Sequence, residues 1–170
     1  MTLTEDQQGM VDSFLSFVAG ECSGDDRYGE SESFRRDAEN IIGVRFTLGP
    51  NCWLETSVET ESPRVRVGFM TDDDNIRNDL MGLFDEMEES PSQVLERALD
   101  EAGLPWESPP VEEVKEEGRF HFFFTPLSID AIDDLDFEFT RVRSKVPRML
   151  EAYMIAFGSA IIMDDEGDFD

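Results

Sequence analysis

The strongest constraint on the fold is a period-two alternation of apolar and polar residues in three consecutive segments, 41–48, 52–59 and 64–70. Side chains alternate between the two faces of a β-strand, so each segment predicts a strand with one buried face. Turn-forming residues follow the first and second segments, at Gly49-Pro50-Asn51 and at Glu61-Ser62-Pro63. The three segments therefore predict an antiparallel meander.

Loop length sets the register of this meander, because a slip of one residue would turn every apolar side chain to the wrong face. A three-residue loop at 49–51 and a two- or four-residue loop around Glu61-Ser62 place apolar residues opposite apolar residues. They also place a glutamate opposite an arginine on the outer face. The expected pairs are Leu48 with Cys52, Phe46 with Leu54, Arg45 with Glu55, Val58 with Val65, and Glu59 with Arg64.

Helical spacing of apolar residues predicts amphipathic helices over residues 3–18, 74–88 and 90–103. The third helix has the clearest ends. Ser90-Pro91-Ser92-Gln93 is a capping box with proline at the first helical position, and Gly103 is a C-terminal stop.

A phenylalanine-rich hairpin is predicted next, from strands at 111–115 and 119–125. The turn between them is Glu116-Glu117-Gly118, where the glycine can adopt the left-handed conformation of a three-residue loop. The residues of the second strand expected to face the core are Phe120, Phe122 and Phe124.

The last part of the chain predicts a helical region followed by an acidic tail. Ser128 is expected to cap a helix that continues to Phe157. Pro147 lies inside this region and must kink the helix or begin a new one, because proline lacks the backbone donor. The tail, residues 158–170, is expected to be flexible.

These elements predict an α+β fold, in which an antiparallel sheet of meander plus hairpin is covered on one face by helices. We expect residues 3–157 to form a single domain. Within it, Gly20–Ser33 is expected to be a loop, and Leu104–Pro110, with three prolines, a linker that packs Trp106.

The charge of the chain excludes several classes of function. Forty Asp and Glu against 14 Lys and Arg give a net charge of −26, which disfavours nucleic acids and anionic membranes as partners. The sequence has no apolar run of the roughly 18 residues that a membrane-spanning helix needs, and its first residues lack a signal-peptide pattern. We therefore expect a soluble, cytoplasmic protein.

Two features of composition bear on the environment of the protein, and the first has two interpretations. Lys115 and Lys145 are the only lysines beside twelve arginines, which suits a salty cytoplasm but also an ordinary acidic protein. Cys22 and Cys52 are too few for a disulfide scaffold and are expected to be reduced thiols.

The order helix, three-stranded meander, helix pair, hairpin, long helix resembles the YbjN-like proteins and the class I chaperones of type III secretion systems. The resemblance covers residues 3–157 in element order, size and acidity. It implies a non-enzymatic protein, often dimeric, that binds segments of protein partners through apolar surface. The helix at 90–103 and the Gly/Ser/acid insertion after the first helix depart from this family's pattern.

Motifs for catalysis or metal binding are not found in the sequence. His121 is the sole histidine and is expected to be a surface residue of a strand. A G-x-S-x-G motif and a glycine-rich phosphate loop are absent. The acidic runs at 72–74 and 164–166 do not have EF-hand spacing. We therefore predict no catalytic residue, no metal and no cofactor.

One group of residues stands out as a candidate interaction site. If the meander and the phenylalanine-rich strand join one sheet, its outer face collects four arginines, the histidine and two aromatic residues. One interpretation is a docking surface for an acidic or amphipathic segment or for a second copy of the chain. The other is ordinary structure, in which Glu55, Glu59 and Glu113 neutralise the arginines and helices cover the aromatics. The residues are Arg45, Trp53, Arg64, Arg66, Arg119, His121 and Phe123.

These observations favour a protein-binding adaptor or chaperone-like module that docks a protein segment or a second copy of itself. The alternative is a small carboxylate-dependent hydrolase or metal-dependent enzyme. A deep cleft with convergent acids of shifted pKa would favour the enzyme, and an apolar surface or groove would favour the binding module.

Overall fold

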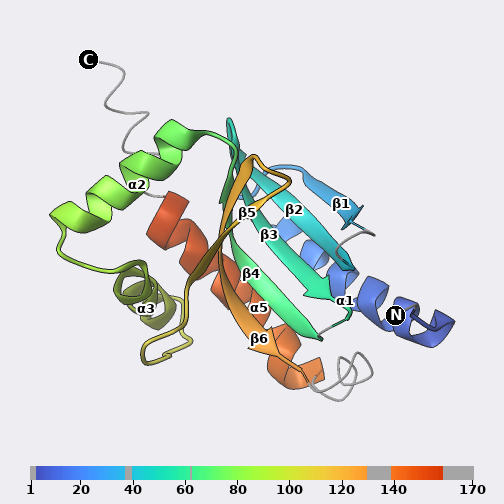
Figure 1. Ribbon diagram of the computed structural model, residues 1–170. Coiled ribbons are helices and arrows are strands. Elements are labelled where there is room, and N and C mark those ends of the chain that lie inside the picture. Colours follow the sequence, from blue (N-terminus) through green and yellow to red (C-terminus); the bar gives the residue numbers. More distant parts are fainter. Residues whose placement is uncertain (1–2, 37–39, 62, 130–138, 159–170) are drawn as a thin grey trace.

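The computed structural model describes residues 3–36, 40–61, 63–129 and 139–158. It contains a six-stranded sheet in the order β1-β2-β3-β4-β6-β5 (Figure 1), and all neighbouring strands are antiparallel. This architecture confirms the predicted α+β class. The strands are β1 (Ser31–Arg36), β2 (Ile41–Gly49), β3 (Cys52–Glu59), β4 (Arg64–Thr71), β5 (Glu112–Glu116) and β6 (Phe120–Ser128).

The register of the meander follows the predicted pairing except at the first turn. Phe46 lies opposite Leu54 and Arg45 opposite Glu55, while β4 pairs with β3 through Val58 with Val65 and Glu59 with Arg64. At the first turn, however, Cys52 pairs with Gly49, and the register shifts between Thr47 and Gly49. A bulge therefore takes Leu48 out of the predicted pair.

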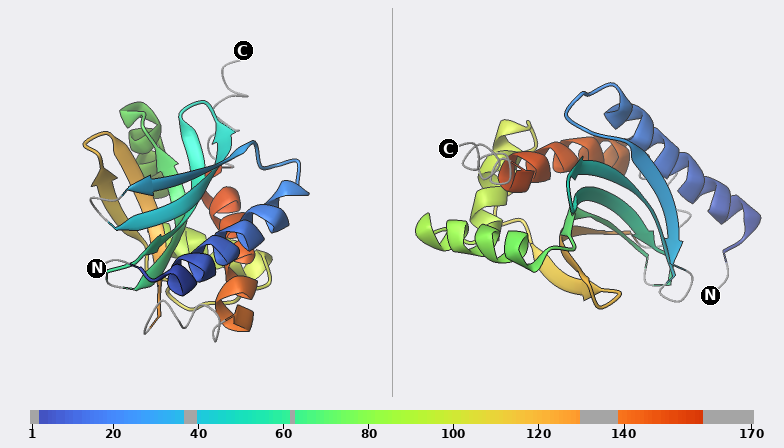
Figure 2. Two further views of the ribbon diagram at one scale, coloured as in Figure 1. Left: turned by 90° about the vertical axis from the view of Figure 1, so that its right-hand side faces the viewer. Right: turned by 90° about the horizontal axis from the view of Figure 1, so that it is seen from above.

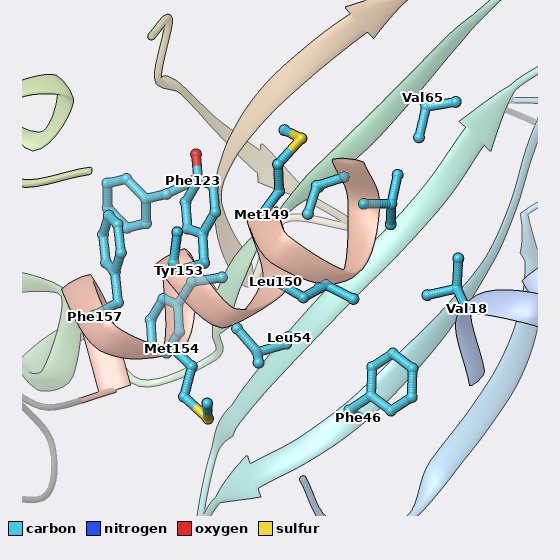
Figure 3. Packing of buried hydrophobic residues seen from close by; sticks show 14 of the residues in the cluster. Val18, Phe46, Leu54, Val65, Phe123, Met149, Leu150, Tyr153, Met154 and Phe157 are labelled. Carbon is cyan, nitrogen blue, oxygen red and sulfur yellow. The ribbon is translucent and has the colours of Figure 1, made fainter. Parts of the chain in front are cut away.

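Two helices cover one face of the sheet (Figure 2). Helix α1 (Glu5–Ser23) begins at a capping box made by Thr4 and Gln7, and its buried residues pack over β2 and β3. Helix α5 (Phe139–Tyr153) packs on β3 and β4 and continues into a short π-helix, η2 (Met154–Gly158). Figure 3 shows how Phe123, Tyr153 and Phe157 pack together in this main core.

Helices α2 (Asp74–Glu86) and α3 (Pro91–Glu101) form a pair to one side of the sheet (Figure 1). The predicted capping box is present, because the Ser90 hydroxyl accepts from the backbone of Gln93 and the Gln93 side chain accepts from the backbone of Ser90. Gly103 has a φ of 83°, as expected for a glycine stop. Helix α3 packs against α5 and η2.

Two predicted boundaries were wrong. The predicted loop, 20–33, overlaps strand β1, which begins at Ser31 and continues to Arg36. Only one residue of this strand, Phe34, is apolar. Such a sequence can form an edge strand because it needs a partner on one side only. Ser128, predicted to cap a helix, is instead the last residue of β6. Of the two alternatives for Pro147, a kink or a new helix, the structure excludes the second, because Pro147 lies inside α5.

The start of the predicted final helix, at residues 130–138, lies outside the described residues. The predicted tail begins at Gly158, which instead is the last residue of η2. The remainder, 159–170, lies outside the described residues.

Strand β6 is turned the opposite way from the prediction. Phe123 lies in the main core, under α5 and η2, whereas Phe120, Phe122 and Phe124 lie on the sheet face opposite α1 and α5, here called the far face. Alternation could not choose between the two orientations, because this strand carries phenylalanine on both faces. Those three phenylalanines and Met70 form a second buried cluster, with Trp53 and Val114 packed against it.

Candidate functional site

The far face holds four of the seven residues predicted as a site. Arg45, Trp53, Arg64 and Arg66 project from three adjacent strands of the sheet. The expected pairs of glutamate and arginine are formed: Arg45 Nε lies 3.1 Å from Glu55 and Arg64 Nε lies 2.9 Å from Glu59. The charge of these arginines is therefore neutralised largely within the chain.

Glu55 lies at the centre of this network. Its side chain has 0% exposure, and its carboxylate oxygens lie 3.1 Å from Arg45, 3.4 Å from Arg66 and 3.8 Å from Arg36. Burial raises the pKa of Glu55 to about 7, although the positive charges of Arg66 and Arg36 oppose this rise. A carboxyl group that titrates near neutral pH is thus built into the sheet.

Two opposite edges of the sheet meet over Glu55. Arg36 ends β1 at one edge and Glu116 ends β5 at the other, yet Arg36 Nη1 donates a hydrogen bond to Glu116. Arg66 Nη1 also donates to Glu116, at 2.5 Å. The sheet is therefore curled strongly enough to close this face by its own side chains.

The arginines of the far face also cover its aromatic rings. The guanidinium carbon of Arg66 lies 4.9 Å from the centroid of Phe122 and 5.3 Å from that of Phe124. Arg45 lies over Phe34 and Phe120 in the same way, at 4.4 and 5.1 Å. Through these cation–π contacts and the ion pairs, the arginines and glutamates cover the buried aromatic cluster of the far face.

The other three predicted site residues do not belong to the far face proper. Arg119 lies at the β5–β6 turn, where it packs over Phe120 at 4.4 Å and its side chain is 65% exposed. Phe123 is 2% exposed in the main core, and His121 lies on the same side of the sheet as Phe123. The prediction that all seven residues share one outer face was wrong for His121 and Phe123.

His121 is held between two carboxylates. Its Nε2 lies 2.6 Å from Asp74 Oδ1 at the start of α2, and its Nδ1 lies 3.8 Å from Glu113 Oε2 on β5. The pKa of Asp74 is lowered, chiefly by the hydrogen bond to His121. Because both ring nitrogens face acids of the same chain, the histidine links α2 to β5 and β6.

A second candidate site lies between the helices, in a groove of about 550 Å³. It is lined by residues of α2, α3 and η2 and by Met87, which follows the end of α2. Met87 is 39% exposed and is the one large apolar side chain classed as exposed among the described residues. We call this the Met87 groove; its lining residues are Leu83, Phe84, Met87, Val94, Arg97, Ala98, Asp100, Glu101, Ile155 and Ala156.

The sequence patterns did not reveal this groove. The apolar residues that line α2 and α3 were interpreted as core-facing stripes, and several of them, such as Phe84 and Ala98, are indeed buried. The helical spacing gave no separate signal, because Leu83 and Met87 lie on the same face of α2 as the buried Leu80 and Phe84. Placing η2 beside them required the three-dimensional structure.

The comparisons with known proteins gave no match to a family model, to a curated protein or to a solved structure. Among the described residues, no helix is both long and apolar enough to cross a membrane. The same part of the chain has no group of three or more His, Cys, Asp or Glu residues placed to hold a metal ion.

Proposed function

We propose that this protein is a protein-binding module that holds an apolar segment of a partner protein in the Met87 groove. The observation that supports the proposal is an exposed methionine in the lining of a mainly apolar groove between α2, α3 and η2. The proposal agrees with the adaptor or chaperone-like role expected from the sequence, but it places that role on the helices rather than on the far face.

The chemistry of the groove favours an apolar ligand. Its walls are formed mainly by aliphatic and aromatic side chains such as Leu83, Phe84 and Ile155, and a flexible thioether such as that of Met87 adapts to ligands of different shape. Its volume of about 550 Å³ is sufficient for several aliphatic side chains of a bound segment.

A synthetic peptide tests this proposal. We suggest an 18-residue helical peptide with leucine on one face and glutamine on the other, labelled for fluorescence anisotropy. The native protein is expected to bind it saturably. A Met87→Asp variant should bind at least tenfold more weakly, a loss of about 1.4 kcal/mol, because it places a charge in the lining of the groove.

The matched control is Ser16→Asp, which adds the same charge at an exposed position of α1. This helix lies away from α2 and α3 (Figure 1). This variant should bind the peptide like the native protein. If the native protein does not bind, or if both variants lose affinity equally, the proposal is contradicted. If sedimentation shows that the native chain is a dimer and that Met87→Asp is a monomer, a second copy fills the groove, and the proposal of a partner protein is contradicted.

A further inference from the structure

The surroundings of the Met87 groove indicate the charge of its partner, an inference that rests on the proposed function. From residue 79 to residue 101, the chain carries one basic residue, Arg97, which forms an ion pair with Glu89 at 3.0 Å. Two of the acids, Asp100 and Glu101, line the groove itself. The acidic residues of this stretch are Asp79, Asp85, Glu86, Glu88, Glu89, Glu96, Asp100 and Glu101.

A second, smaller cleft of about 240 Å³ adjoins the groove across α3. We call it the Trp106 cleft; it is lined by Glu96, Arg97, Asp100, Pro105, Trp106 and Glu107. Arg97 and Asp100 line both cavities, so the two form a continuous surface. The lining of the Trp106 cleft combines a half-buried indole with three carboxylates and one guanidinium group, that of Arg97, so acids outnumber bases there. An aromatic ring flanked by acids is an arrangement that favours an ammonium or guanidinium group.

The structure also indicates the conformation of the ligand. The groove is walled by helices, whose backbone groups are already paired internally and cannot extend a sheet to an incoming strand. A helix satisfies its own backbone and can place one apolar face in such a groove. A second copy of this chain, at a net charge of −26, would be repelled by the same acids.

We propose that the partner segment is a cationic amphipathic helix, which places its apolar side chains in the Met87 groove and a Lys or Arg side chain in the Trp106 cleft. The acids around the two cavities attract the basic face of this helix from solution, and the apolar walls hold it. The proposal therefore divides the affinity into two contributions. The electrostatic attraction is weakened by salt, and the apolar contact is not.

Three helical peptides separate these contributions. They share the same leucine face, and their polar faces carry lysine, glutamine or glutamate. In 50 mM NaCl the native protein should bind the lysine peptide at least tenfold more tightly than the glutamine peptide, and it should not bind the glutamate peptide. In 500 mM NaCl the affinity for the lysine peptide should fall to within about threefold of that for the glutamine peptide. A Trp53→Phe variant retains Trp106 as its one tryptophan. The fluorescence of this variant should change when the lysine peptide binds.

Two double variants test the site with equal changes of charge. Asp100→Lys with Glu101→Lys should weaken binding of the lysine peptide about tenfold and leave the glutamine peptide unchanged. Asp12→Lys with Glu21→Lys, on exposed positions of α1, should change neither by more than about threefold.

The outcomes distinguish the inference from the proposed function. If the glutamine and lysine peptides bind equally and without dependence on salt, the groove binds apolar helices but the inferred charge preference is wrong. If neither peptide binds, both the inference and the proposed function fail. If the α1 variant weakens the lysine peptide as much as the groove variant does, the attraction comes from net charge, and the assignment to these two cavities is overturned.

Discussion

At the scale of single residues, Glu55 has the least usual environment in the described structure. It has no exposed surface, and its charge is balanced by Arg36, Arg45 and Arg66. Burial destabilises the ionised carboxylate more than these arginines stabilise it, so the pKa of Glu55 is raised to about 7. The residue therefore links folding to pH near neutrality.

This link predicts the sign of a pH effect. Between about pH 4.5 and pH 7 the folded protein retains the Glu55 proton while the unfolded chain loses it, so stability falls as the pH rises. Relative to a Glu55→Gln variant, the native protein should lose about 2–3 kcal/mol of unfolding free energy from pH 5 to pH 8.5. Urea unfolding of both proteins across this range measures the difference. A difference that stays constant with pH would show that Glu55 is ionised throughout.

Gly68 is required by a close approach of two strands. A Cβ atom at this position would lie 1.9 Å from the carbonyl oxygen of Phe123 on β6. Gly68→Ala should therefore lower the free energy of unfolding by about 2–3 kcal/mol, because the backbones of β4 and β6 must separate. Gly9→Ala on α1 is the control, since a Cβ there meets no atom within 4 Å. That variant should gain about 0.5–1 kcal/mol from helix propensity, and equal effects of the two would refute this explanation.

At the scale of elements, the contact between Arg36 and Glu116 joins the two edges of the sheet. Glu116→Gln should cost about 2 kcal/mol of unfolding free energy, because both Arg36 and Arg66 lose a charged acceptor in a largely buried place. Glu117→Gln offers a neighbouring control: Glu117 also lies near Arg36, at 3.6 Å, but its side chain is 48% exposed. Its replacement should cost less than about 1 kcal/mol. Similar losses in the two variants would argue against a structural role for the joined edges.

The elements also show what the sequence could and could not predict. The meander and most of its register were predictable because apolar alternation, turn residues and glutamate–arginine pairs agreed with one another. The orientation of β6 was not, because Phe122, Phe123 and Phe124 supply apolar groups to both faces. Strand β1 was missed because an edge strand with one apolar residue has no alternation to detect.

The candidate site was predictable only in part. The pairs Arg45–Glu55 and Arg64–Glu59 followed from the register, and the structure has them as ion pairs. The curl that brings Arg36 to Glu116 could not be inferred, because it depends on the accumulated twist of six strands. The Met87 groove depends in turn on where η2 packs between α2 and α3, a contact between segments more than 50 residues apart.

At the scale of the whole molecule, a net charge of −26 makes the folded state sensitive to ionic strength. Carboxylates repel one another more strongly in the compact state than in the unfolded chain, and salt screens this repulsion. Raising NaCl from 0.02 M to 1 M should increase the melting temperature by about 5 °C, corresponding to roughly 2 kcal/mol for a chain of this size. Thermal scans followed by circular dichroism measure the change. An unchanged or lower melting temperature in high salt would contradict this account.

The whole molecule thus presents two contrasting surfaces. On the far face, the chain's own glutamates neutralise the arginines and the sheet edges close over the aromatic cluster. Around the Met87 groove, the apolar surface is accessible and most of the surrounding acids have no basic side chain from the same segment to balance them. The proposed binding site therefore combines accessible apolar surface with an excess of acidic side chains.

Amide chemical-shift mapping of the full chain, titrated with the lysine peptide, tests this claim most directly. We predict saturable shifts confined to the residues around the two cavities, in α2, α3, η2, Met87 and the segment 105–107, with Ala98 and Ile155 among those affected. No change is expected at Arg45 or Trp53 on the far face. Shifts centred on the far face, or no saturable shift at all, would contradict the assignment of binding to the Met87 groove.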